Sequence, residues 1–148
     1  FQFEQELKMT KQQVREEARD IDGDPMVKQR RRQIQLQLAR QRMMKELPEA
    51  EVVITNPTEL AVALKYKVEE MDAPVVVAMG AGVFARRIRE LAAQYNIPII
   101  ENRPLAQLLF HQAEVGRVVP EETFVAVAEI LAYVYQLTNR YVPPRAGR

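Results

Sequence analysis

The amino-acid sequence predicts an α/β domain in which a sheet of about four strands is surrounded by helices and preceded by a long N-terminal linker helix. Over residues 48–138, short runs rich in Val and Ile alternate with longer stretches whose apolar residues recur at helical spacing. This alternation is typical of a sheet covered by helices. Nearly half of the 148 residues are apolar, which suffices for one core, and the chain is too short for two domains of typical size.

The chain is expected to begin with a polar arm, residues 1–24, followed by a linker helix, residues 25–47, that leads towards a membrane anchor. Asp24 is a suitable N-cap, and Pro25 then occupies the first helical position, where a missing N–H costs nothing. The following residues are mostly strong helix formers. Pro48 ends the helix, because proline disfavours helical backbone in the residue before it.

Four strands are expected in the region 48–138. The run 51–55 is mostly β-branched, and the run 60–66 alternates large apolar residues on one face with small or polar residues on the other. The run 73–79 is continuously apolar, as is typical of a fully buried strand, and Gly80 is expected to end it. The fourth strand, 97–100, is short.

Helices are expected over about 84–95, 105–115 and 120–137. The first has apolar residues at helical spacing with charged residues between them, and Asn96 supplies its C-terminal stop. Pro120 is expected at the start of the last helix. Residues 139–148, which include Pro143 and Pro144, are expected to form a flexible tail.

Composition argues against several classes of function. The net charge of +1 is too small to attract the whole surface to nucleic acid. The sequence has no cysteine, which excludes disulfides, thiolate metal sites and a cysteine nucleophile. His111 is the single histidine and is interpreted as a helix-surface or interface residue, because no second histidine or cysteine can share a metal ion with it. No metal or cofactor is therefore expected.

The beginning of the chain bears on its relation to membranes. No apolar run approaches the roughly 18 residues that a membrane-spanning helix needs. The sequence starts with Phe1 rather than Met, so it is expected to be an excised or processed piece whose upstream context is missing. Any membrane anchor is expected in that missing part.

The most informative motif is Asn56-Pro57-Thr58-Glu59, between the first two expected strands. It predicts a turn, because Asn favours the first position and Pro the second position of a type I turn, and most such turns are uncut. Pro57 has no N–H, which closes the usual attack of the next backbone nitrogen on an Asn side chain. The reverse reaction remains: the Asn56 side-chain nitrogen attacks its own main-chain carbonyl, closes a five-membered imide and expels the Pro57 nitrogen. A turn that holds these atoms in near-attack geometry needs no cofactor.

A second motif, Gly80-Ala81-Gly82, follows the third expected strand and precedes a helix, as in the opening of a nucleotide-binding βαβ unit. The full glycine fingerprint fails, since Ala85 stands three residues after Gly82, although alanine is tolerated there. No acidic residue follows at the end of a second long strand. The simpler, purely structural interpretation is a strand-to-helix turn. A nucleotide- or small-ligand-binding α/β domain that uses this turn is the alternative function.

The linker helix carries a stretch of basic residues without an acidic residue among them. Two interpretations stay open: a solvated helix, and a helix close to anionic lipid or to an acidic partner. Nucleic acid is not expected as a partner, because no aromatic residue is interleaved to stack on bases. The basic residues are Lys28, Arg30, Arg31, Arg32, Arg40, Arg42 and Lys45.

Several segments together resemble the cytoplasmic domain of the flagellar type III export switch protein, the FlhB family. The resemblance covers roughly residues 24–138 and favours the flagellar branch over the related virulence-secretion proteins. The segments that carry it are 52–58, 61–66, 73–78 with the Gly80-Ala81-Gly82 turn, 86–90, 96–99, 104–106 and 126–135.

The resemblance implies a domain that hangs by its linker helix from upstream membrane-spanning helices, at the cytoplasmic face of the export gate in the bacterial inner membrane. It implies autocleavage between Asn56 and Pro57, which permits the switch from exporting rod and hook subunits to exporting filament subunits. The implied partners are these export substrates, a hook-length control protein, and subunits of the gate and of the ATPase complex. Lipid head groups are expected to contact the basic helix. The protein is not expected to be an enzyme acting on other molecules, since autocleavage is a single turnover.

One position departs from the family pattern, which usually has His after Asn-Pro-Thr where this chain has Glu59. We expect Asn56 to be the nucleophile, Pro57 to supply the leaving nitrogen, and Thr58 to hold the turn by a side-chain to backbone hydrogen bond. A carboxylate at position 59 can take a proton from the Asn56 amide but is a poor acid for the leaving nitrogen. Slower cleavage than in a His-bearing relative is therefore expected. The alternative is that Glu59 abolishes cleavage and leaves a docking domain.

Overall fold

The computed structural model describes residues 23–57 and 59–138. Its residues belong to two compact units, the first ending at Gln41 and the second beginning at Arg42. The expectations for the polar arm, for Thr58 and for the tail fall wholly or almost wholly outside the described residues. Within the described residues, no helix combines the length and the apolar character that crossing a membrane requires.

The expected linker helix is α3 (Pro25–Glu46), none of whose residues is buried. The predicted N-cap is confirmed, because the Met26 N–H donates to Asp24 Oδ1 at 2.9 Å. The helix ends one residue earlier than expected, and a 3-10 turn, η1 (Leu47–Glu49), contains Pro48. Leu47 is fully buried, so this turn begins the core of the second unit.

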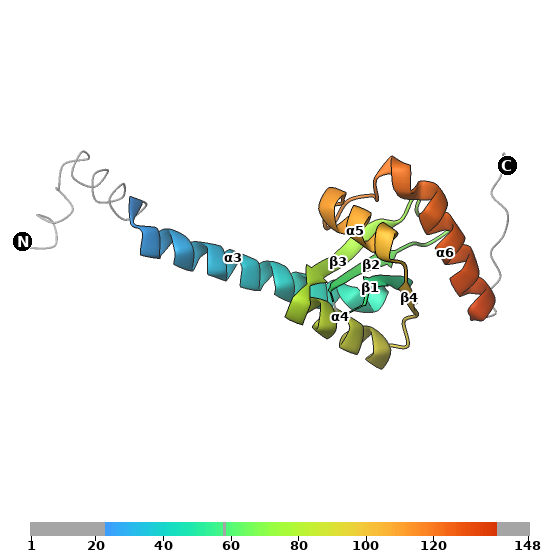
Figure 1. The fold of residues 1–148 in the computed structure, drawn as a ribbon, viewed down its shortest axis with the longest axis horizontal. Helices are drawn as coiled ribbons and strands as arrows, with labels where there is room; N and C mark the ends of the chain where they lie inside the picture. The colour runs from blue at the N-terminus through green and yellow to red at the C-terminus, as the bar shows by residue number, and fades with distance from the viewer. Residues whose placement is uncertain (1–22, 58, 139–148) are drawn as a thin grey trace, which may run out of the picture. The chain divides into compact units, whose positions relative to one another are not determined.

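The second unit is built on a four-stranded mixed sheet of order β3-β2-β1-β4 (Figure 1). Its strands are β1 (Val52–Asn56), β2 (Leu60–Lys65), β3 (Val75–Ala81) and β4 (Ile99–Glu101). The chain runs antiparallel from β1 to β2 and from β2 to β3, whereas β4 lies parallel to β1. The predicted α/β class with about four strands is confirmed.

Helices cover both faces of this sheet, with α4 on one face and α5 and α6 on the other (Figure 1). Their bounds are α4 (Gly82–Gln94), α5 (Arg103–Gln112) and α6 (Phe124–Leu137), and a 3-10 turn, η2 (Glu121–Thr123), precedes α6. The helix α4 forms the crossover that returns the chain to the parallel strand β4, as parallel pairing requires.

Every residue of β1 is buried, because successive side chains of a strand point to opposite faces and both faces are covered. Val52 and Ile54 join the core cluster under α5 and α6, and Val53 joins the cluster under α4. The expected alternation along β2 is confirmed, with its large apolar residues in one core cluster and its small residues in the other. Ala61 and Ala63 are fully buried in the cluster that includes α4, where their size lets the helix approach.

The bounds of all four strands differ from the expectations. The strand β1 spans Val52–Asn56 rather than 51–55, β2 ends at Lys65 rather than at residue 66, and β3 begins at Val75 rather than at residue 73. The strand β3 ends at Ala81 rather than before Gly80, because Gly80 still pairs with Ala61 of β2. The strand β4 spans Ile99–Glu101 rather than 97–100, since the Ile97 N–H donates to the Ala92 carbonyl at the end of α4.

The helix bounds also differ. The helix α5 begins at Arg103, two residues early, because the Asn102 side chain accepts from the Leu105 N–H at 3.1 Å and caps it. It ends at Gln112 instead of about residue 115. The last helix starts as the 3-10 turn η2 after Pro120, where the Thr123 hydroxyl donates to the Pro120 carbonyl at 2.6 Å.

Candidate functional site

The predicted turn joins β1 to β2. Asn56 is the last residue of β1 and pairs with Leu60, the first residue of β2. Pro57 has no N–H for the strand ladder, so the ladder stops there. The Glu59 N–H donates to the Asn56 carbonyl oxygen at 3.0 Å, which closes a four-residue turn. The structure thus brings together three of the four predicted site residues, and Thr58 lies outside the described residues.

The Asn56 side chain is held inside this turn. Asn56 is 5% exposed, and its Nδ2 donates to Glu59 Oε2 at 3.1 Å. A hydrogen bond to a carboxylate is stronger than one between neutral groups. Glu59 itself is exposed, so it connects a buried amide with solvent. The group expected to attack therefore already contacts a proton acceptor.

The backbone of Glu59 contacts the carbonyl that this attack would reach. Donors aimed at an oxygen where negative charge develops are among the strongest contributions to catalysis. Glu59 therefore meets both partners of the expected reaction, the nucleophile through its carboxylate and the carbonyl through its N–H. Sequence reasoning predicted the carboxylate and missed the N–H. The signal for it was the turn, since a type I turn often places the N–H of its fourth residue on the first carbonyl.

Neighbouring elements hold the turn on both sides. Before it, the Thr55 carbonyl accepts from the Asn102 N–H at 2.9 Å, beside β4. After it, the Glu59 carbonyl accepts from the Gly82 N–H at 3.0 Å, at the start of α4. The chain on either side of Asn56 is thus fixed by separate elements of the domain.

The Gly80-Ala81-Gly82 motif does not have the structure of a phosphate-binding turn. Gly80 and Ala81 belong to β3, and the Gly82 N–H is already bonded to Glu59. A phosphate site at a helix start uses free backbone N–H groups. One of the N–H groups that a phosphate would need is therefore already hydrogen-bonded within the protein.

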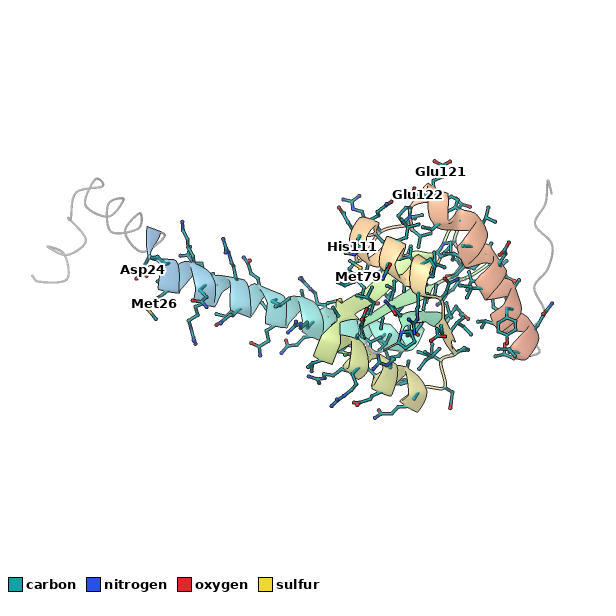
Figure 2. All side chains as sticks on the ribbon, viewed as in Figure 1. Asp24, Met26, Met79, His111, Glu121 and Glu122 are labelled. Carbon is teal, nitrogen blue, oxygen red and sulfur yellow. The ribbon has the colours of Figure 1, made fainter. Side chains whose placement is uncertain are left out.

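The remaining candidates do not join this site. His111 lies exposed in the last turn of α5 (Figure 2). Its ring stands edge to face with that of Phe110, at 5.6 Å between centroids. In the part of the chain that the structure describes, no group of three acidic or metal-ligating side chains is placed to hold a metal ion. The basic residues of α3 are all exposed.

Comparison with known proteins gives the class. The sequence profile described as the FlhB, HrpN, YscU and SpaS family matches residues 1–134. The chain therefore belongs to this family of flagellar and type III export proteins. It is 53% identical over 131 residues to the flagellar biosynthetic protein FlhB of Yersinia enterocolitica, a match that covers 88% of this chain and 34% of that protein. FlhB of Bacillus subtilis is 48% identical over 140 residues, which covers 95% of this chain and 39% of that protein.

Solved structures agree with this assignment. The cytoplasmic domain of FlhB from Shewanella putrefaciens matches with a TM-score of 0.64 and 40% identity, over 70% of this chain and 85% of that one. A mutated EscU C-terminal domain matches with a TM-score of 0.60 and 32% identity, over 62% of this chain and 92% of that one. The chain spans little more than a third of the length of the curated relatives named above.

Proposed function

We propose that this chain is a self-cleaving regulatory and docking module of the flagellar export apparatus. Cleavage between Asn56 and Pro57 would permit the switch from exporting rod and hook subunits to exporting filament subunits. Family membership supports the setting. The observation that carries the chemistry is that Glu59 contacts both the Asn56 side-chain nitrogen and the Asn56 carbonyl oxygen.

The reaction is an internal transfer of an acyl group. Asn56 Nδ2 forms a bond to its own main-chain carbonyl carbon, and the bond from that carbon to the Pro57 nitrogen breaks. One proton leaves Nδ2 and one arrives on the Pro57 nitrogen, which becomes a secondary amine. Water then opens the cyclic imide and leaves a carboxylate on residue 56. Because every group comes from one turn, the entropic cost of assembling the reactants is already met by folding.

Glu59 takes two parts in this scheme. Its carboxylate, 3.1 Å from Asn56 Nδ2, accepts the proton that the nucleophile loses. Its N–H, 3.0 Å from the Asn56 oxygen, stabilises the negative charge that grows there as the carbonyl is attacked. Pro57 contributes by leaving no backbone nitrogen proton that could start the competing attack. Thr58 keeps its proposed part in holding the turn.

The two pieces should stay together after cutting. The piece that ends at Asn56 includes β1, which lies between β2 and β4 in the sheet. Four side chains in its described part, residues 23–56, are large, apolar and fully buried, and each such burial contributes about 1.5–3 kcal/mol. They are Leu47, Val52, Val53 and Ile54. The cut is therefore proposed to change the turn and its surroundings while the fold remains.

The family suggests where this module works and with what. We place it at the cytoplasmic face of the bacterial inner membrane, with residues 25–47 as the linker towards membrane-spanning helices and residues 48–138 as the cleaving domain. The partners are export substrates, a hook-length control protein and other subunits of the gate and of the ATPase complex. Pull-down with purified rod, hook and filament subunits tests this, and no binding to any of them would contradict it.

The basic stretch of α3 is proposed to lie against anionic lipid head groups. All seven basic side chains are exposed, and each cation near such a surface contributes about 1 kcal/mol. We expect the protein to sediment with vesicles of phosphatidylcholine and phosphatidylserine, and Arg30→Gln, Arg31→Gln and Arg32→Gln together to weaken this strongly. A control with equal charge loss changes Arg86, Arg87 and Arg103 to Gln. Equal weakening in both variants would contradict a role specific to α3.

The direct test is an intact-mass spectrum of the freshly purified, denatured protein, repeated after days at neutral pH. We expect two fragments that meet at Asn56 and Pro57, with the first fragment lighter by one water while the imide persists. Size-exclusion chromatography of the same sample without denaturant should show one species. A single full-length mass that never changes would overturn self-cleavage and leave a docking domain.

A further inference from the structure

The start of α4 adopts an unusual backbone. Gly82, its first residue, has a φ of +57°, in the left-handed region that favours glycine. An added Cβ at this position would meet no atom within 4 Å. The requirement for glycine therefore comes from the backbone conformation and not from lack of space. Since packing does not explain this conformation, the contacts of the Gly82 backbone are the place to look for its role.

The Gly82 N–H donates to the Glu59 carbonyl oxygen at 3.0 Å. Glu59 is the residue that contacts Asn56 twice, through its N–H and through its carboxylate. Fixing the carbonyl of a residue restricts the rotation of that residue as a whole. The bond from Gly82 therefore limits how far both contacts of Glu59 can move away from Asn56.

We propose that Gly82 is a positioning residue for cleavage at Asn56. Its left-handed backbone aims the N–H at Glu59, and Glu59 in turn keeps its proton acceptor and its backbone donor on the reacting atoms. This inference rests on the proposed self-cleavage. A misplacement of about 1 Å in a reacting group can cost about a hundredfold in rate, so a contact one residue removed from the scissile turn can control it.

The experiment compares three variants with the parent protein. Gly82→Ala puts a side chain on a left-handed backbone without any clash, Gly82→Asn does so with a residue that tolerates this conformation, and Gly116→Ala is the matched control. Gly116 also has a positive φ, of +86°, and open space around it. Its N–H donates to the Val76 carbonyl at 2.7 Å, near the start of β3, whereas Gly82 follows the end of β3.

Cleavage half-lives come from intact-mass time courses, and stability comes from urea unfolding of each variant combined with Asn56→Ala, which keeps it uncut. Gly82→Ala should lengthen the half-life by about ten- to a hundredfold. Gly82→Asn should stay within about threefold of the parent, because asparagine enters the left-handed region readily. Gly116→Ala should lose comparable stability and keep the parental half-life.

Several outcomes would overturn the inference. Gly82→Ala with the parental half-life removes the positioning role, and so does Gly116→Ala that slows cleavage as much as Gly82→Ala, since the effect would then follow stability. If Gly82→Ala does not fold, Gly82→Ser replaces it, and equal half-lives for the Ser and Asn variants count against us. A parent that never cleaves overturns the proposed function and this inference together, whereas a cleaving parent with an indifferent position 82 overturns this inference alone.

Discussion

The two hairpin connections of the β1-β2-β3 meander differ in what holds them. The first, residues 57–59, is bonded through Glu59 to Asn56 on one side and to Gly82 of another element on the other. In the second, residues 66–74, the Glu70 and Met71 N–H groups both donate to the Lys67 carbonyl within the loop. Both connections are closed by backbone hydrogen bonds within the turn, and the Pro74 carbonyl at the end of the second also accepts from the Val119 N–H of another segment. In the first, the same residue, Glu59, makes both the closing bond and the backbone bond to another element. The contact from Gly82 therefore bears on the residue that touches the proposed nucleophile, Asn56.

Replacing one side chain at the start of the first connection and one within the second tests this difference most severely. Asn56→Ala removes the only nitrogen that can close the imide, so we expect no cleavage after days at neutral pH. Glu69→Ala, an exposed position of the second connection, should leave the half-life unchanged. Intact mass spectrometry measures both. Cleavage in Asn56→Ala would mean that the bond breaks by another route.

Lengthening each connection by two glycines tests whether cleavage depends on the geometry of the turn, since all the original residues are kept. Inserted between Thr58 and Glu59, they move the Glu59 contacts away from Asn56 and should slow cleavage by at least about a hundredfold. Inserted between Glu69 and Glu70, they should leave the half-life unchanged. They should lower stability mainly through the lost bonds to the Lys67 carbonyl, since closing the longer loop adds less than about 0.6 kcal/mol. Equal effects of the two insertions on the half-life would refute the contrast between the connections.

Of these changes, replacing the side chain at position 59 while keeping the turn should alter the cleavage half-life least. Glu59→His supplies a group that can also protonate the leaving nitrogen, so we expect the half-life to shorten by up to about tenfold. Glu59→Gln keeps the N–H and loses the proton acceptor, and it should lengthen the half-life. A His variant slower than the parent would show that the carboxylate is the better partner for Asn56.

Much of the fold could be predicted from the sequence because its signals are local. The β-branched run before Asn56 and the proline after it predict both the strand and the place where it stops. The end of β3 could not be predicted, because Gly80 stays in the sheet only through its pairing with Ala61, a residue distant in sequence. A similar limit applied to the burial of the small face of β2, which depends on where α4 packs.

In the candidate site, too, some residues could be predicted from the sequence and one could not. Asn56, Pro57 and Glu59 are adjacent in sequence, and their side-chain chemistry makes them visible without a structure. Gly82 could not be identified from the sequence, because it contributes a backbone N–H, which nearly every residue possesses. The fold alone brings this N–H beside Glu59. Sequence reasoning noticed this glycine but read it as the start of a ligand site or a plain turn.

The burial of Asn56 has a consequence for the cut protein. Cleavage would replace a neutral peptide bond with a carboxylate on a residue that is 5% exposed and an ammonium on Pro57. An ionised carboxylate is strongly disfavoured away from water unless it is paired, and the Glu59 carboxylate already contacts the same residue, 3.1 Å from Asn56 Nδ2. Faster hydrogen exchange at the Glu59 amide in cut protein than in Asn56→Ala would report the repulsion, and equal exchange would rule it out. Self-cleavage would then act as a change of electric charge at one end of an otherwise unaltered sheet.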